Sequence, residues 1–566
     1  MIESSSGASQ PLVHHPSSQW PSNSECDASS APQTPDPRRT HNGSGPGSSH
    51  QNDHIVPEEA KLPSSDERRD IRTPEYPPTW RLVIITISLF LAFFCTALDN
   101  TIIATAIPRI TSQFHSLGDV GWYGSAYLLT TCSMTLIFGK MYTFYSCKWV
   151  YLISLGIFEI GSLVCGVTPT SVGLILGRAI AGLGSAGIES GSILVVAQTV
   201  PVARRPVYMG LFGTTFGIAN VLALVLLYQF ANRRSHGSLY LVLLQDTSAR
   251  KATCWDNGTI IPIRPSGYVV LPARHHLSAA GVAMGGKGIS LGGSRVITLL
   301  VISGVLILTF IALQWWRQEK ATIPPRLIAN RNMWGAALFT FCVNASFMVF
   351  VFYIPIWLQG IKNVTATQSG IMTLPMILGM ITMSLLSGIL VTLTGYYTPF
   401  MLVSPVLSSV GAGLLSTLQV GSGHSQWIGY QALYGMGIGI GIQQSVISIQ
   451  TVLSPDDMPS ATAILMFMQT LGGTIFISIA QTIFHTSLLR NLRTEAPAVD
   501  AVAIARAGAN SFRDQVDGDL IPAVLRAYNS AIVYAFYVAV AVGVLAIFGA
   551  LPMKCISVKR KSPLSE

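Results

Sequence analysis

Apolar residues form a series of long runs from Leu82 onward, and polar residues gather in the segments between these runs. An α-helix needs about 20 residues to cross the hydrocarbon layer of a membrane. Twelve runs reach this length, at about 82–107, 121–143, 149–168, 171–200, 206–229, 296–316, 333–358, 369–393, 397–418, 427–449, 461–486 and 530–552. The pattern predicts an all-α polytopic membrane protein.

Two stretches of the chain do not follow this pattern. Residues 1–79 are rich in Ser, Pro, Gly and His without apolar periodicity, which predicts a disordered cytoplasmic tail with no cleavable signal sequence. Residues 230–295 have mixed character, and their apolar pieces are too short or too interrupted to span a membrane. We therefore expect five spans in 80–229, a divergent segment at 230–295, seven spans in 296–552 and a cytoplasmic tail at 553–566.

Composition and charge narrow the class of protein. The 566 residues are 50% hydrophobic and only 11% charged, which excludes a set of ordinary soluble domains. The formal net charge is +9, but Lys and Arg lie beside the apolar runs, which favours cytoplasmic topology signals over nucleic-acid binding. Both termini are predicted to be cytoplasmic. The eight cysteines lack metal-ligand spacing, so neither a disulfide framework nor a metal site is expected. The sequons at Asn363 and Asn257 are candidates for glycosylation on the outer side.

Arg178 lies within the fourth apolar run. It shares one helix face with Gly182, Ser185, Glu189 and Ser192, because these positions step by four and three. A central arginine costs roughly 2.5 to 3.5 kcal/mol on membrane-insertion scales and is normally paired or faces a water-filled cavity. The pattern predicts that this face looks into the helix bundle, where Arg178 has either a structural pair with a carboxylate or a role in transport.

Three carboxylates lie at membrane depth: Asp99, Glu159 and Glu189. Burial disfavours the charged form of an acid and a nearby cation favours it. A carboxylate that moves between these settings can take up a proton on one side of the membrane and release it on the other. Asp99 is the main candidate, since it lies well inside the first run with Thr96 one turn before it. Glu159 is either a proton-handling acid or a bridge to a neighbouring helix.

Glycines at 182, 184 and 187 have the GxGxxG spacing of a dinucleotide loop. Such a loop needs a preceding strand and a helix N-terminus, whereas these glycines lie in the middle of an apolar run. Small residues there favour the close approach of two helices, and Gly435 to Gly441 has the same character. Further helix-packing or cavity positions are expected at Ser185, Gln431, Gln443 and Gln469.

Several motifs together resemble the fourteen-span drug:proton antiporters of the major facilitator superfamily, in particular the fungal toxin and multidrug efflux branch. They include "LDNTIIATAIPRI", "GWYGSAYLL", "GSLVCG", "RAIAGLGSAG", "FYIPIWLQGIK", "SGIMTLP", "GYQALYGMGIGIGIQQ" and "MQTLGGTIF". The resemblance covers about 80–221 and 292–556. It implies two pseudo-symmetric six-helix halves with two extra central spans, a central substrate cavity and alternating access driven by a proton gradient, with no other cofactor. Asp99 then corresponds to the acid of the first-span motif, Arg178 to the fourth-span arginine linked with proton coupling, and Gly182 and Gly184 to the glycines of that motif.

The chain departs from the family pattern at two places. The loop after the second span keeps Gly139 and Lys148 but has Thr143 and Phe144 where the superfamily motif has Asp and Arg. In addition, the glycine-proline motif of the fifth span and the next two spans are not recognisable in residues 222–292. An alternative splice, a gene-model error and a decayed gene are the hypotheses for this segment.

The resemblance leads to one main functional hypothesis, which is proton-coupled export of amphipathic small molecules such as toxins, secondary metabolites or drugs. Proton-coupled uptake of a nutrient or siderophore and a non-transporting remnant are the alternatives. No ATP site or catalytic triad is visible, so neither a primary pump nor an enzyme is expected. We expect a monomer that contacts the lipid bilayer, protons and a small-molecule substrate in the plasma membrane, with a vacuolar or vesicle membrane as the alternative.

Overall fold

The computed structural model describes residues 77–114, 120–232, 305, 308–309, 312, 314–316, 321–507 and 512–559. The tail before residue 77, most of the divergent segment 230–295, most of the span expected at 296–316 and the sequon at Asn257 lie outside the described residues. Within the described part, nine helical stretches are long and apolar enough to cross a membrane. The chain is therefore a helical multi-pass membrane protein.

The first five helices form a packed unit, called here the first helix group. Their bounds are α1 (Thr79–Phe114), α2 (Val120–Phe144), α3 (Cys147–Val167), α4 (Ser171–Thr199) and α5 (Arg205–Asn232). Along the chain they match the first five predicted spans. α4 begins where the Thr170 side chain accepts a hydrogen bond from the Gly173 amide, which satisfies one of the free N–H groups of the first turn. α3 packs along α4, and α1 and α2 also contact it, so α4 is the central helix of this group.

The later helices form the second helix group. Their bounds are α9 (Pro325–Ala329), α10 (Arg331–Lys362), α11 (Ala366–Met372), α12 (Leu374–Thr394), α13 (Thr398–Leu415), α14 (His424–Gly441), α15 (Gln444–Val452), α16 (Met458–Glu495), α17 (Ala501–Ala507) and α18 (Ile521–Ala550). Two predicted spans are each divided into two helices. The run 369–393 is broken at Thr373, two residues before Pro375, because proline has no amide hydrogen to donate to the carbonyl of Ile371 four residues earlier. The run 427–449 is interrupted at residues 442–443, after four glycines that lower helix propensity.

The helices at the C-terminal end are longer than the apolar runs predicted. α16 continues to Glu495, not 486, and α18 begins at Ile521, not 530. The extra turns carry exposed charges, and Arg526 pairs with Glu495 at 3.7 Å. Apolar length reports the thickness of the hydrocarbon layer, so it underestimates a helix that extends into the aqueous phase.

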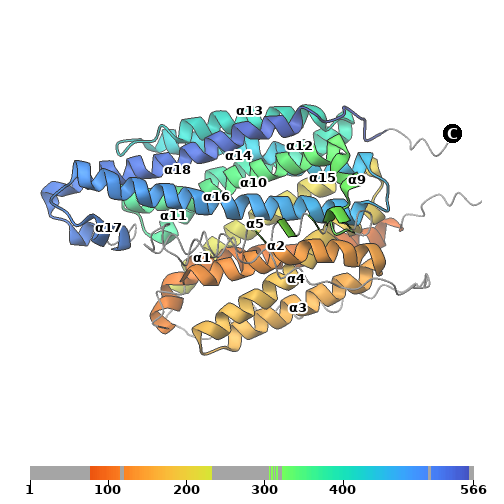
Figure 1. Ribbon diagram of the computed structural model, residues 1–566, viewed down its shortest axis with the longest axis horizontal. Helices are drawn as coiled ribbons and strands as arrows, with labels where there is room; N and C mark the ends of the chain where they lie inside the picture. The colour runs from red at the N-terminus through yellow and green to blue at the C-terminus, as the bar shows by residue number, and fades with distance from the viewer. Residues whose placement is uncertain are drawn as a thin grey trace, which may run out of the picture. The chain divides into compact units, whose positions relative to one another are not determined.

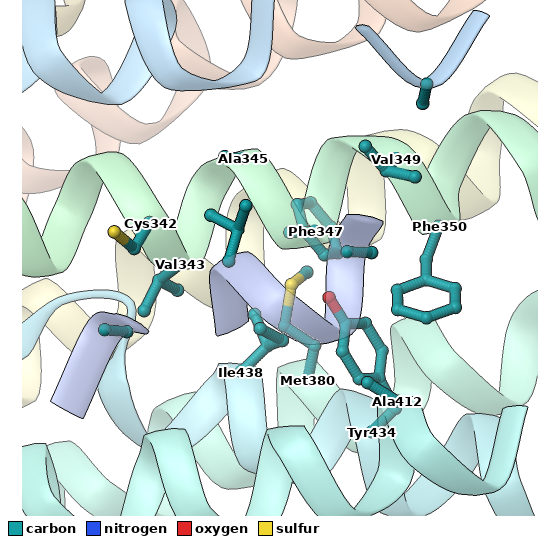
Figure 2. Packing of buried hydrophobic residues seen from close by; sticks show 14 of the residues in the cluster. Cys342, Val343, Ala345, Phe347, Val349, Phe350, Met380, Ala412, Tyr434 and Ile438 are labelled. Atoms are coloured by element: carbon teal, nitrogen blue, oxygen red, sulfur yellow. The ribbon is translucent and has the colours of Figure 1, made fainter. Parts of the chain in front are cut away.

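Aromatic rings fill the core of the second helix group. Phe350 on α10 lies 4.6 Å from the Tyr434 ring of α14 and 5.0 Å from the Phe536 ring of α18, measured between ring centroids. The Tyr434 hydroxyl is hydrogen-bonded to the Ser346 hydroxyl at 3.0 Å, which satisfies its polar end inside the core. Figure 2 shows Phe350 and Tyr434 together with Met380 from α12. These contacts tie four helices of the second group to one another.

The two groups meet along two helix pairs, α5 with α12 and α2 with α16 (Figure 1). Glycines permit both approaches. A Cβ added at Gly210 would lie 2.6 Å from the carbonyl oxygen of Ser384, and one at Gly139 would collide with Ala463. The interface therefore depends on small residues from both groups.

Arg205 connects the groups at the end of the bundle where α5 begins. Its Nε donates to the Val200 carbonyl at 2.9 Å and its Nη2 to the Ala197 carbonyl, both at the C-terminal end of α4. Its Nη1 reaches the Gln450 carbonyl of α15 at 3.5 Å. Carbonyls at a helix C-terminus favour a cation. Arg205 thus joins the ends of two helices from different groups.

Arg205→Ala is expected to favour conformations in which α5 and α15 separate at this end. Hydrogen bonds to charged groups contribute about 1.5 to 3 kcal/mol, so the ratio of separated to joined molecules should rise about tenfold or more. Double electron–electron resonance between spin labels at the exposed positions Tyr145 and Asp456 would measure how far the two groups separate at this end. Arg204→Ala, at the exposed neighbouring residue, is the matched control. Identical distance distributions for the two variants would show that Arg205 does not hold α5 and α15 together.

Candidate functional site

An ion pair joins α1 and α4 inside the first helix group. Nη1 of Arg178 donates to Oδ2 of Asp99 at 2.6 Å, although the two residues lie 79 positions apart in the sequence. The Arg178 side chain is 1% exposed and the Asp99 side chain 14%. Removing one partner of a buried pair leaves a charge without compensation and typically costs about 3 to 5 kcal/mol. The structure therefore brings two of the predicted site residues into direct contact.

α2 holds the same guanidinium from another side. Nε of Arg178 donates to the carbonyl oxygen of Tyr123 at 3.1 Å. Its Cζ lies 4.3 Å from the centroid of the Tyr127 ring, which is a cation–π contact. The remaining nitrogen, Nη2, is buried, and no described residue is its hydrogen-bond partner. Three helices thus fix the position of the arginine, and one of its donors stays available.

Glu189 lies on the same face of α4, beyond Ser185. Its Oε1 accepts a hydrogen bond from the Ser185 hydroxyl at 3.0 Å. Glu159 lies on α3 and is half-buried, next to the fully packed Phe158. The structure therefore separates the three acids: Asp99 contacts Arg178, Glu189 contacts Ser185, and Glu159 belongs to a different helix.

The glycines of α4 lie where neighbouring helices approach most closely. A Cβ at Gly182 would collide with the Tyr127 carbonyl of α2, and one at Gly184 with the Phe158 backbone of α3. The Thr131 hydroxyl also donates to the Gly182 carbonyl at 3.0 Å. These glycines lie in the middle of a helix and bring α2 and α3 against α4.

The predicted glutamines of the second group lie at three separate places. Gln431 on α14 is 1% exposed, and within the described part of the chain its Oε1 has no hydrogen-bond partner. Gln443 precedes α15, and its Cγ would lie 3.9 Å from a Cβ at Gly213 of α5, so it reaches the interface between the groups. The carbonyl oxygen of Gln469 accepts a bond from Nδ2 of Asn344 at 2.6 Å.

The sequon at Asn363 lies at the end of α10. Asn363 is exposed and has the left-handed conformation, with φ of 55°. Thr365, the hydroxyl residue of the sequon, caps α11 by accepting a bond from the Gln368 amide at 3.2 Å. Glycosylation at this position stays a prediction.

Two contributions to the site were not anticipated from the sequence. The Tyr123 carbonyl and the Tyr127 ring both bind Arg178, yet the motif "GWYGSAYLL" served only to indicate a family resemblance. The signal that was present is spacing, because Tyr123, Tyr127 and Thr131 recur every four residues and share one face of α2.

The sequence profile described as Major Facilitator Superfamily matches residues 89–243. Among curated proteins, MFS-type transporter astH of Aspergillus oryzae is 54% identical over 503 residues, which is 86% of this chain and 89% of that protein. Efflux pump roqT of Penicillium rubens is 46% identical over 520 residues, 89% of this chain and 96% of that protein.

Solved structures agree with this chain in fold. The proton:xylose symporter XylE has a TM-score of 0.53 and 13% identity, and the match covers 83% of this chain and 95% of that one. The human organic anion transporter MFSD10 has a TM-score of 0.53 and 15% identity, with 82% and 100% covered. At this level of identity the agreement concerns the fold alone.

Proposed function

The chain belongs to the major facilitator superfamily of membrane transporters, and we propose that it exports amphipathic small molecules, such as fungal secondary metabolites, in exchange for protons. We place it in the plasma membrane as a monomer with cytoplasmic termini. The relatives named efflux pumps support the direction of transport. The observation that carries the proton coupling is the buried pair of Asp99 and Arg178, since intramembrane ionisable residues are typically functional.

The pair suggests how a proton can change the conformation. While Asp99 is ionised, it holds Arg178 and thereby joins α1 to α4. A proton on Asp99 removes the negative charge and weakens the contact, after which the two helices can move relative to each other. Loss of the proton on the other side restores the pair. Asp99 would be the acid that carries the proton in each cycle, and Arg178 would be the partner that it releases and binds again.

The proton gradient supplies enough free energy for this exchange. One proton that enters through roughly 100 mV gains about 2.3 kcal/mol. Two pH units add about 2.7 kcal/mol. Together these terms amount to about 5 kcal/mol and sustain a gradient of about four-thousandfold for a neutral substrate.

Inside-out plasma-membrane vesicles test the proposal. Yeast vesicles that contain the full chain would be acidified by their own proton pump and incubated with a panel of fungal polyketides, terpenoids and cyclic peptides. Mass spectrometry of the vesicle contents should show accumulation of at least one compound that a protonophore abolishes. Accumulation only in right-side-out vesicles would favour proton-coupled uptake, and accumulation in neither orientation would favour a non-transporting remnant.

A further inference from the structure

An apolar hollow opens on the surface of the second helix group between α12 and α13. Both helices pack against α14, which forms the base of the hollow. Its volume is about 150 Å³. The lining consists of Met383, Ser387 and Leu390 of α12, Pro399, Phe400 and Val403 of α13, and Ile440 of α14.

Glycines of α14 explain why α12 and α13 flank it so closely. A Cβ added at Gly439 would collide with the Met380 carbonyl oxygen of α12, and one at Gly441 with the Ser404 hydroxyl of α13. Ile440 lies between these two glycines and is 5% exposed. The side chain of Ile440 therefore closes the hollow from below, while α12 and α13 form its walls.

The rim of the hollow consists of side chains that face lipid. Val403 is 50% exposed, and Leu386 and Leu393 on α12 are exposed as well. Lipid chains are about as apolar as leucine, so such residues are compatible with the hydrocarbon layer. The Ser387 hydroxyl in the lining donates to the Ser384 carbonyl at 3.0 Å and is thereby satisfied within α12. The hollow therefore suits a hydrocarbon chain.

A lysine lies one turn beyond the hollow, at the end of α12. Nζ of Lys559 donates to the Leu393 carbonyl oxygen at 2.5 Å. Leu393 follows Leu390 of the lining by three residues, which is about 4.5 Å along the helix. The bond uses one of the three N–H donors of the ammonium group, and Lys559 is exposed. Among the ion pairs of the described residues, none includes this lysine, so its charge is available to a ligand.

The C-terminal tail is fixed against the loop that joins α12 to α13. The Val558 amide donates to the Gly395 carbonyl at 2.8 Å, and the Tyr397 hydroxyl donates to the Lys554 carbonyl at 2.7 Å. Lys554 is exposed, and Tyr397 lies two residues before Pro399 of the lining. These bonds hold a second lysine near the same end of the hollow.

We infer that the hollow binds one anionic phospholipid, with an acyl chain between α12 and α13 and the phosphate at Lys559. Lys554 adds a second positive charge near the headgroup. The proposed cytoplasmic C-terminus places this end at the leaflet that carries anionic lipids. Charge complementarity distinguishes this ligand from a neutral phospholipid or a sterol. The inference adds a lipid ligand to the proposed exporter and does not depend on proton coupling.

Photo-crosslinking of the full chain in detergent micelles tests the site. The probe is phosphatidylserine with a diazirine in one acyl chain, and mass spectrometry identifies the cross-linked peptides. Cross-links are expected within residues 383–403. Unlabelled phosphatidylserine should suppress them at a concentration about tenfold lower, or less, than phosphatidylcholine with the same chains, since each lysine near an anionic headgroup contributes about fivefold in affinity.

Neutral substitutions test the contribution of charge. The double variant Lys554→Gln and Lys559→Gln should retain cross-links in the hollow but lose the preference for phosphatidylserine over phosphatidylcholine. Arg493→Gln is the matched control, because it removes an exposed positive charge in the last turn of α16. This control should keep the preference. Equal loss in both variants would show that net charge, and not this site, selects the lipid.

A second pair of variants tests the hollow itself. Val403→Trp should fill the hollow and reduce its cross-links to background. Val410→Trp makes the same change two turns further along α13, at a valine that is 52% exposed and outside the lining, and should leave the cross-links unchanged.

Three results would overturn the inference. They are equal competition by phosphatidylcholine, stronger competition by ergosterol, and unchanged cross-links in Val403→Trp. None of these measurements involves transport. A wild type that accumulates no compound of the metabolite panel would therefore refute the proposed function without affecting the lipid site.

Discussion

Asp99→Asn should abolish the accumulation of substrate that a proton gradient drives in inside-out vesicles. Asparagine has the size of aspartate and retains an oxygen that can accept the bond from Arg178, but it cannot gain or lose a proton. The ionised pair would therefore never form again, and the movement of α1 and α4 would no longer be coupled to a proton. The compound that the wild type accumulates from the metabolite panel is the probe, and the expected loss is complete within the detection limit.

Two comparisons distinguish lost coupling from lost folding. Substrate exchange at equal pH on both sides needs no net proton movement, so Asp99→Asn should retain it while Arg178→Ala, which leaves an uncompensated acid, should fold less well. Glu495→Gln is the matched control, because it removes a carboxylate from an exposed pair, which contributes about 0 to 1 kcal/mol. Accumulation by Asp99→Asn at the wild-type level would contradict the assigned role.

The ion pair was predictable from the sequence because an acid and an arginine at membrane depth are both costly to leave alone. The acid in the first apolar run and the arginine in the fourth each suggested a buried partner. The structure places Oδ2 of Asp99 2.6 Å from Nη1 of Arg178. The contribution of Tyr127 was not predictable in the same way. A tyrosine in an apolar run is equally compatible with packing against lipid or another helix, and only the rotation of α2 brings this ring onto Arg178.

The length of the apolar runs predicted where the helices lie, but it did not predict where two of them are interrupted. A hydropathy pattern records which residues enter the hydrocarbon layer, so the breaks at Thr373 and at residues 442–443 leave no trace in it. Pro375 was a local signal of the first break, because it lacks the amide hydrogen that would continue the helix. The second break lies in a glycine-rich stretch for which the sequence indicated close helix packing. Glycine has no side chain, and this absence both permits close packing and lowers helix propensity.

Gly184→Val should greatly reduce the yield of folded protein. The added Cβ would overlap the Phe158 backbone of α3, which cannot move aside as a flexible side chain would. Overpacking of this kind costs about 1 to 3 kcal/mol, and more when backbone must shift. Since α3 and α4 pack along much of their length, we expect a lower melting temperature in detergent and a smaller monodisperse peak in size-exclusion chromatography.

Gly156 provides the control that isolates this contact. It lies on α3, and an added Cβ would meet no atom within 4 Å. Gly156→Ala should be neutral or stabilising by about 0.5 to 1 kcal/mol, since alanine favours the helix, whereas Gly184→Ala should lower the melting temperature. The two substitutions have the same chemistry and the same helix preference, so opposite signs can arise only from the space around each glycine. Equal effects would show that the approach of α3 to α4 does not depend on Gly184.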